Sequence, residues 1–133
     1  MKNSLIIKKK INFFTKKIFV EGDKSISIRW VLLSSLSKKK SRAYNLLKSE
    51  DVISALKCIQ KLGSRVKITK NYHEVIGTGI NFKEKKNIIL DAGNSGTLGR
   101  LILGLLLHAK NKIKIIGDKS FSKRDFLRVT KPL

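Results

Sequence analysis

The sequence predicts a mixed α/β fold, and three observations lead to this prediction. Short runs rich in Ile, Val and Phe alternate with stretches whose apolar residues recur at helical spacing. The chain has 133 residues, 41% of them hydrophobic, which is enough for one ordinary domain with its own core. No linker rich in Pro, Gly and Ser divides it, since the single proline is Pro132.

The charge balance is extreme and narrows the classes of partner. Thirty Lys and Arg against nine Asp and Glu give a formal net charge of +21. Such a chain suits anionic partners, namely nucleic acid, acidic lipid or phosphorylated small molecules. A lysine-rich composition with solvated side chains explains the excess equally well. A small basic nucleic-acid-binding protein is one hypothesis, although aromatic residues make up only 7% and no nucleic-acid-binding motif is present.

The cysteine and histidine content argues against disulfides and zinc. Cys58 is the only cysteine and lies in an apolar helical pattern, so we expect a small core residue in a reducing compartment. His73 and His108 lie far apart, with no metal-ligand spacing around them. The apolar runs are too short for a signal peptide or for the roughly 20 residues that span a bilayer. We therefore expect a cytoplasmic protein without membrane contact.

The first elements are expected to be two strands and a helix. Residues 5–14 and 17–20 are rich in Ile and Phe and are predicted as strands. The helix that follows is predicted from "SIRWVLLSSLS", with Ser25 or Ser27 as its N-cap. Its apolar residues at helical spacing are Ile28, Val31, Leu32 and Leu36.

The next elements are a short strand, "SRAYNLL", and the clearest helix of the chain, "KSEDVISALKCIQKLGS". Ser49 is the expected N-cap, Glu50 and Asp51 complement the helix dipole, and Gly63 ends the helix. One face consists of Val52, Leu56, Ile59 and Leu62.

The second half of the chain continues the alternation. "RVKIT", "HEVIGTG" and "NIILDAG" are predicted as strands, with a hairpin turn at residues 70–71. "NSGTLGRLILGLLLHAK" is apolar nearly all round and predicts a buried helix. "KIKII" is the last predicted strand, and "SKRDFLRVTKPL" looks like the start of a helix at which the chain stops. We expect from this ending a truncated polypeptide.

Two octets share six of their eight letters, "GDKSISIR" at residues 22–29 and "GDKSFSKR" at residues 117–124. In the first octet, the Lys24 ammonium can attract an oxyanion as a point charge, and the planar Arg29 guanidinium can bind one through two parallel hydrogen bonds. The serine hydroxyls are further donors. The second octet offers a similar set of donors, although an ordinary basic loop explains it too. Its donors are Lys119, Ser120, Ser122, Lys123 and Arg124.

The segment "LDAGNSGTLGR" places a glycine-rich turn, residues 93–97, between a strand and an apolar helix. Such a turn lets backbone N–H groups and the helix dipole meet an anion, although many such turns are only turns. No lysine follows in the register of a Walker A loop. The three loops together suggest a pocket for a small ligand with several negative charges. None of the nine carboxylates makes a convincing acid–base pair.

Four motifs carry a family resemblance: "GDKSISIR", "SEDVISALKCIQKLG", "GNSGTLGRL" and "GDKSFSKRDF". Their order and spacing resemble the N-terminal part of the 5-enolpyruvylshikimate-3-phosphate synthase family, from about residue 17 to the end. The related UDP-N-acetylglucosamine enolpyruvyl transferases share the fold and a similar Gly-Thr loop. They do not typically carry the Lys-Ser-x-Ser-x-Arg pattern, so they are the second alternative.

The resemblance implies an activity and a site. The family transfers the enolpyruvyl group of phosphoenolpyruvate to the 5-hydroxyl of shikimate 3-phosphate and releases phosphate, without metal or organic cofactor. This step of the shikimate pathway leads to chorismate and the aromatic amino acids. Lys24 would be catalytic and touch both substrates, and Ser25 and Arg29 would hold shikimate 3-phosphate. The residues implied for phosphoenolpyruvate, besides Lys24, are Asn94, Gly96, Thr97 and Arg124.

The resemblance also implies a fold of βαβαββ units, incomplete here because the family is much longer. Residues 1–20 would be strands that pack on the second domain. Residues 21–133 would be part of the first substrate-binding domain, and the second domain would be absent. The chain alone is therefore expected to be inactive. It departs from the family pattern at Glu21, Ile28 and Asp125, and the two carboxylates would weaken anion binding by like-charge repulsion.

Overall fold

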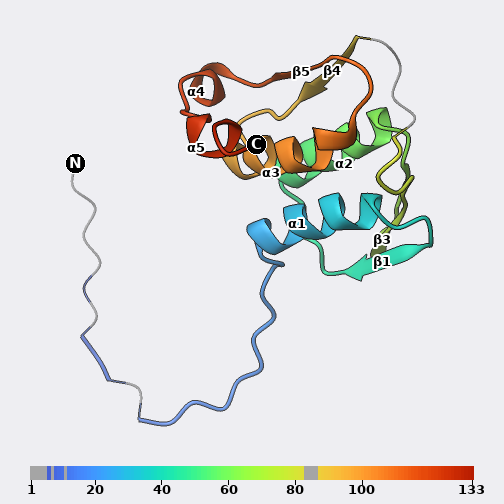
Figure 1. Cartoon of the computed structure of the whole chain (residues 1–133). Coiled ribbons are helices and arrows are strands. Elements are labelled where there is room, and N and C mark those ends of the chain that lie inside the picture. Colours follow the sequence, from blue (N-terminus) through green and yellow to red (C-terminus); the bar gives the residue numbers. More distant parts are fainter. Residues whose placement is uncertain (1–5, 7, 11, 83–86) are drawn as a thin grey trace.

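The computed structural model describes residues 6, 8–10, 12–82 and 87–133. Three helices form a layer between two small sheets (Figure 1). The helices of this layer are α1 (Lys24–Ser35), α2 (Glu50–Lys61) and α3 (Gly96–Leu105). The strands are β1 (Ser41–Tyr44), β2 (Arg65–Ile68), β3 (Tyr72–Ile76), β4 (Ile88–Asp91) and β5 (Ile113–Ile116). Three short helices complete the described part: η1 (Leu106–His108), α4 (Lys119–Ser122) and α5 (Leu127–Thr130).

The two sheets differ in topology. The first has the order β1-β3-β2, and β3 pairs antiparallel with both neighbours. Strands β2 and β3 form the predicted hairpin, whose turn is closed by a hydrogen bond of 3.0 Å from the Thr69 amide to the Tyr72 carbonyl. The second sheet pairs β4 and β5 in parallel, with α3 as the crossover between them. These findings confirm the mixed α/β fold and the predicted order of elements from residue 24 onward.

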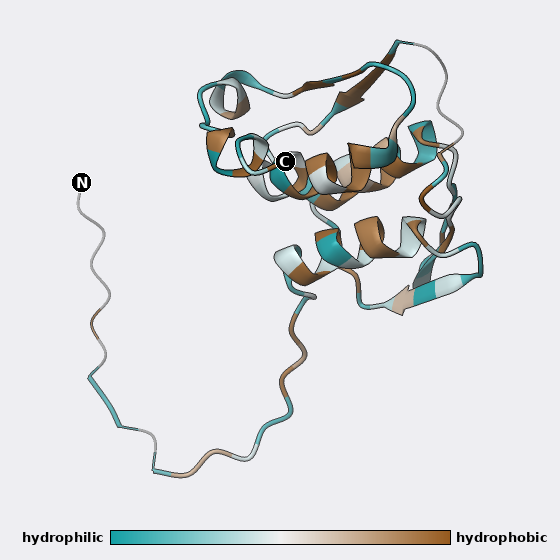
Figure 2. Cartoon of the chain, in the orientation of Figure 1, coloured by the Kyte–Doolittle hydropathy of each residue, from teal (hydrophilic) through white to brown (hydrophobic). Residues whose placement is uncertain are grey.

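The core lies where the apolar faces of the helices meet each other and the sheets (Figure 2). Ile28 and Val31 of α1 are 0% exposed and pack into the same cluster as the predicted face of α2. Leu98 and Ile102 extend it along α3, and Cys58 is buried as expected. Burying such side chains stabilises the fold by about 1.5–3 kcal/mol each.

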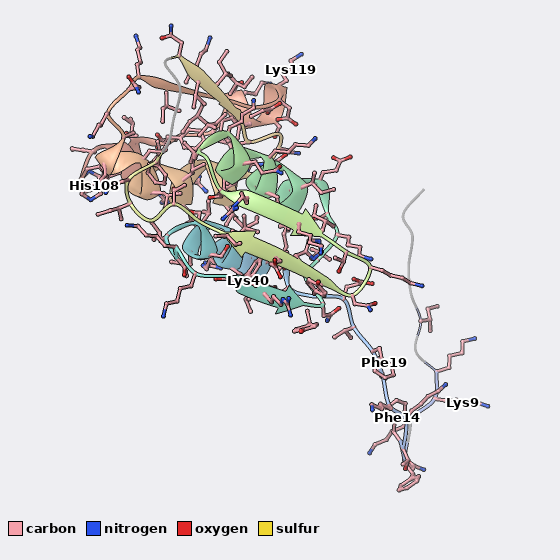
Figure 3. All side chains as sticks on the ribbon, turned by 90° about the vertical axis from the view of Figure 1, so that its right-hand side faces the viewer. Lys9, Phe14, Phe19, Lys40, His108 and Lys119 are labelled. Atoms are coloured by element: carbon pink, nitrogen blue, oxygen red, sulfur yellow. The ribbon has the colours of Figure 1, made fainter. Side chains whose placement is uncertain are left out.

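The predicted N-terminal strands are not observed in the described residues. The described residues of 6–20 form no strand and run away from the body as an extended segment, with Lys9, Phe14 and Phe19 projecting from it (Figures 1 and 3). Part of the predicted strand at residues 5–14 lies outside the described residues. A strand needs a neighbour for its backbone N–H and C=O groups, and β-rich composition alone does not supply one.

Two helix caps differ from the prediction. Helix α1 is capped by Asp23, whose carboxylate accepts a hydrogen bond of 2.7 Å from the Ile26 amide. Neither Ser25 nor Ser27 caps it, because both lie inside the helix. Ser49 holds the N-cap position of α2 as predicted, but its hydroxyl makes no capping bond and is buried without a partner among the described residues.

Helix α3 is less buried than its composition predicts. Its inward face, including Leu98 and Ile102, is buried, but Leu101 is 40% exposed. Further along the chain, Leu107 in η1 is 58% exposed. The reason is that α1 and the segment that contains α4 and α5 cover only part of the surface of α3. Leu101 lines a groove between α1 and α3 together with the exposed Leu33 and Leu36 of the α1 side.

Candidate functional site

The candidate site lies at the starting ends of the helices. In Figure 1, α1 and α3 both begin on the side of the molecule where α4 lies. The amide of Asp118, at the start of α4, donates a hydrogen bond of 2.9 Å to the Gly93 carbonyl in the loop between β4 and α3. This bond joins the second octet to the glycine-rich turn.

Arg124, Asn94 and Gly96 come together at the start of α3. The Nη2 atom of Arg124 donates a hydrogen bond of 2.8 Å to Oδ1 of Asn94. A Cβ atom at Gly96 would overlap the Arg124 guanidinium, so the guanidinium lies directly against the backbone of the first residue of α3. Thr97 follows and is half-buried. A guanidinium has five N–H donors, so the hydrogen bond to Asn94 orients the group and leaves other N–H donors for a ligand.

The loop that presents these residues is shaped by its own polar groups. Oδ1 of Asp91 accepts a hydrogen bond of 2.8 Å from the Gly93 amide, and Gly93 has a φ of 55°, which favours glycine. Ser95 caps α3 through a hydrogen bond of 3.3 Å from the Leu98 amide. The sequence prediction missed Asp91, although Asp two residues before Gly after a strand is a usual turn signal.

Lys24 is the first residue of α1, and its Nζ lies 3.2 Å from Oδ2 of Asp51 on α2. The Lys24 side chain is 53% exposed and that of Asp51 is 19% exposed. The sequence prediction gave Asp51 only a helix-dipole role and missed this pair. An anion that binds Lys24 therefore competes with Asp51 for the ammonium group, in water that screens the attraction.

The start of α2 connects the Lys24 pair with the glycine-rich turn. Ser54 lies one helical turn after Asp51, on the same face of α2. Its Oγ would lie 3.2 Å from a Cβ atom at Gly93. The first turns of α2 thus make two contacts: Asp51 contacts Lys24, and Ser54 contacts the loop between β4 and α3.

Arg29 lies apart from this group. It lines the groove between α1 and α3, which has a volume of about 460 Å³, and no ion pair or hydrogen bond among the described residues joins it to Arg124 or Asn94. Ser25 is half-buried on α1. Ser27 is buried and accepts a hydrogen bond of 3.1 Å from the Leu47 amide, so it holds the loop between β1 and α2 against α1.

The two octets share a local structure. Asp118 caps α4 through a hydrogen bond of 2.7 Å from the Phe121 amide, as Asp23 caps α1. Both glycines are held against other backbone: Cβ atoms at Gly22 and Gly117 would overlap carbonyl oxygens of the loops beside them. The shared Gly-Asp pair is therefore explained by two local needs: the glycine lets two backbone segments approach closely, and the aspartate caps the helix that follows.

The departures from the family pattern have different structural roles. Ile28 is 0% exposed and belongs to the core. The Asp125 carboxylate accepts a hydrogen bond of 2.7 Å from the Leu127 amide near the start of α5. Glu21 lines a separate polar cavity. In the part of the chain that the structure describes, no group of three or more His, Cys, Asp and Glu is placed to hold a metal ion, and no helix is long and apolar enough to cross a membrane.

Comparisons with known proteins converge on one family. The model of the family "EPSP synthase (3-phosphoshikimate 1-carboxyvinyltransferase)" matches residues 8–133. A 3-phosphoshikimate 1-carboxyvinyltransferase from Bacillus cytotoxicus is 39% identical over 116 residues, 87% of this chain and 27% of the relative. One from Ruthia magnifica is 38% identical over 130 residues, 98% of this chain and 30% of the relative.

The solved structures agree. An EPSP synthase from Acinetobacter baumannii superposes with a TM-score of 0.77 at 31% identity, over 89% of this chain and 27% of that one. The chain thus spans between a quarter and a third of the length of these relatives. The amino-sugar enolpyruvyl transferase and the nucleic-acid-binding protein are not favoured by these matches. The chain belongs to the EPSP synthase (3-phosphoshikimate 1-carboxyvinyltransferase) family.

Proposed function

We propose that this chain supplies part of the substrate site of an enzyme that moves the enolpyruvyl group of phosphoenolpyruvate to the 5-hydroxyl of shikimate 3-phosphate. The observation that supports it most is the arrangement of Arg124, Asn94 and Gly96 at the start of α3. An oriented guanidinium beside free helical N–H groups suits a small phosphate or carboxylate. Both substrates are polyanions, so bringing them together requires cations held in place.

The proposed roles follow the resemblance residue by residue. Lys24 is the catalytic residue and contacts both substrates, once its ammonium leaves Asp51. Ser25 and Arg29 hold shikimate 3-phosphate. Arg124, Asn94, Gly96 and Thr97 hold phosphoenolpyruvate. No metal or organic cofactor enters this proposal.

The rest of the active enzyme is a proposed partner of this chain. Residues 21–133 form part of the first substrate-binding domain, and residues 1–20 pack as strands on the second domain when it is present. The exposed leucines beside the α1–α3 groove and the exposed Phe13 and Phe19 support this proposal, because apolar patches of this kind mark interaction surfaces. The single cysteine is buried and free, which fits the cytoplasm as the proposed compartment.

Calorimetric titration of the purified chain with each substrate tests the proposed site. Arg29→Ala is expected to weaken the binding of shikimate 3-phosphate, and Arg124→Ala the binding of phosphoenolpyruvate. Each affinity is expected to fall by about tenfold or more, because a charge-assisted hydrogen bond is lost. Arg65→Ala on β2, away from the site, is the matched control. Equal effects of all three variants would count against the assignment. Turnover by the chain alone would disprove the proposal that the remaining part is needed.

A further inference from the structure

A second polar cavity lies at the end of the β1-β3-β2 sheet where β3 begins. Its volume is about 270 Å³, and it contains none of the candidate substrate residues. The sheet, the loop before α2, the β2–β3 turn and the segment before α1 all contribute to its wall. Its lining residues are Glu21, Asn45, Leu46, Lys48, Lys70, Asn71, Tyr72 and His73.

His73 is the buried titratable group of this cavity. It lies on the central strand β3, on the same face as buried Val75, and is 7% exposed. The sheet holds it on both sides, because it pairs with Ala43 of β1 and Ile68 of β2. Among the described residues no hydrogen bond to its imidazole is observed. Burial, followed by the nearby Lys48 charge, lowers the pKa of His73, so the imidazole is neutral near pH 7.

Two cationic side chains and two side-chain amides line the cavity around this imidazole. Lys48 and Lys70 contribute two ammonium groups, and neither forms an ion pair in the described part of the chain. Asn45 has a φ of 54° and donates a hydrogen bond of 3.2 Å to the Val20 carbonyl, which holds its amide in the wall. Among the described residues, Glu21 is the only carboxylate in the lining.

We propose that this cavity is a binding site for a small tetrahedral oxyanion, inorganic phosphate or a phosphate monoester. Lys48 and Lys70 supply the charge, the amides of Asn45 and Asn71 supply further N–H donors, and His73 donates at the floor. A volume of about 270 Å³ accommodates such an anion together with several waters, each of which takes about 30 Å³. This inference does not depend on the proposed enzyme activity.

The proton state of His73 links binding to pH. The charged and titratable groups that line the cavity with it are Glu21, Lys48, Lys70 and Tyr72. A bound anion favours the imidazolium, so binding raises the pKa of His73 and tightens as the pH falls through it. Sulfate is the useful probe, because it remains a dianion throughout the range in which an imidazole titrates, so any pH dependence of binding comes from the protein.

The experiment follows the ring signals of both histidines by NMR while the whole chain is titrated with sodium sulfate, and then with phosphate, at constant ionic strength. His73 is expected to show a saturable shift and a raised pKa. His108 lies outside the cavity, in the groove that Arg29 also lines, and serves as an internal control in the Arg29→Ala variant, which lacks the candidate anion-binding side chain of that groove. Lys48→Met and Lys70→Met are each expected to weaken binding about tenfold, as one charge-assisted bond is removed. Lys57→Met on α2 is the matched control.

The proposal would be overturned by no saturable shift at His73, by an equal shift at His108 in Arg29→Ala, or by an equal loss in Lys57→Met. Unchanged amide spectra of the lysine variants exclude unfolding as the cause of any loss. Arg124→Ala separates this site from the candidate substrate site, because it is expected to leave the His73 response unchanged. Loss of that response in Arg124→Ala would place the anion at the substrate site and contradict the proposal.

Discussion

Arg124 donates its Nη2 hydrogen bond to Oδ1 of Asn94, a residue 30 positions earlier in the chain, over 2.8 Å. The parallel pairing of β4 with β5 explains this contact. Asn94 follows β4 and Arg124 follows β5, and the carboxyl ends of parallel strands meet at the same edge of a sheet. The Ala92 amide extends the pairing with a hydrogen bond of 2.8 Å to the Ile116 carbonyl.

Gly96→Ala is predicted to displace Arg124, because the new Cβ would overlap the guanidinium. The bond to Asn94 should be lost, and phosphoenolpyruvate binding should fall by about tenfold or more. The signal of the Arg124 Nε–H group by NMR and calorimetric titration measure the two effects.

Gly104→Ala in the same helix is the matched control, because a Cβ there meets nothing within 4 Å. It is expected to raise the free energy of unfolding by about 0.5–1 kcal/mol, since alanine loses less backbone entropy in a helix. An unchanged Arg124 signal in Gly96→Ala would show that the guanidinium does not lie against this glycine.

Asp23→Ala is predicted to lower the free energy of unfolding by about 1 kcal/mol, because the Ile26 amide loses its capping acceptor. Asp23→Asn should restore most of this loss, since asparagine caps as well as aspartate without the charge. Urea unfolding followed by circular dichroism measures both variants. A loss in the asparagine variant as large as in the alanine variant would point to the charge, and not the cap, as the stabilising feature.

Cys58 is predicted to react slowly with iodoacetamide in the folded chain. Burial raises the pKa of its thiol from 9.0 to about 11, and its Sγ lies 3.4 Å from the Asp91 carbonyl that accepts its hydrogen bond. At about pH 8 the thiolate fraction is then about a hundredfold lower than in the unfolded chain. Mass spectrometry of labelling with and without urea measures the ratio. Equal rates would show that the thiol is open to solvent.

Removal of residues 1–19 is predicted to leave the unfolding midpoint unchanged and to reduce self-association. Phe13 is 84% and Phe19 85% exposed, so they add nothing to the core while offering apolar surface to other molecules. Val20 is kept because its carbonyl accepts the hydrogen bond from Asn45. Light scattering and thermal unfolding of the two chains measure the effects. A lower midpoint after removal would mean that the segment packs on the body.

Local patterns predicted much of the described structure. The spacing of Val52, Leu56, Ile59 and Leu62 correctly predicted the buried face that runs through α2 to its C-cap, and Gly63, with a φ of 98°, ends the helix as expected. The residue types and positions of the glycine-rich turn and of Arg124 predict oxyanion-binding loops, but they do not predict the contact between them. Local patterns were less reliable in two places. The strands predicted in residues 5–14 and 17–20 are not observed in the described residues, because a strand depends on a partner. The cap of α1 is Asp23 and not the predicted serine, because several neighbouring residues can each cap a helix.

The sequence by itself determined the mixed α/β class, the family and the set of candidate anion-binding residues, because these depend on residue types at fixed spacing along the chain. Only the tertiary structure decided which of them meet. The pairing of β4 with β5 joins Arg124 to Asn94, and the packing of α1 on α2 gives Lys24 its partner Asp51. Arg29 faces the α1–α3 groove instead. Such contacts depend on strand pairing and helix packing between distant segments, which local sequence patterns do not specify.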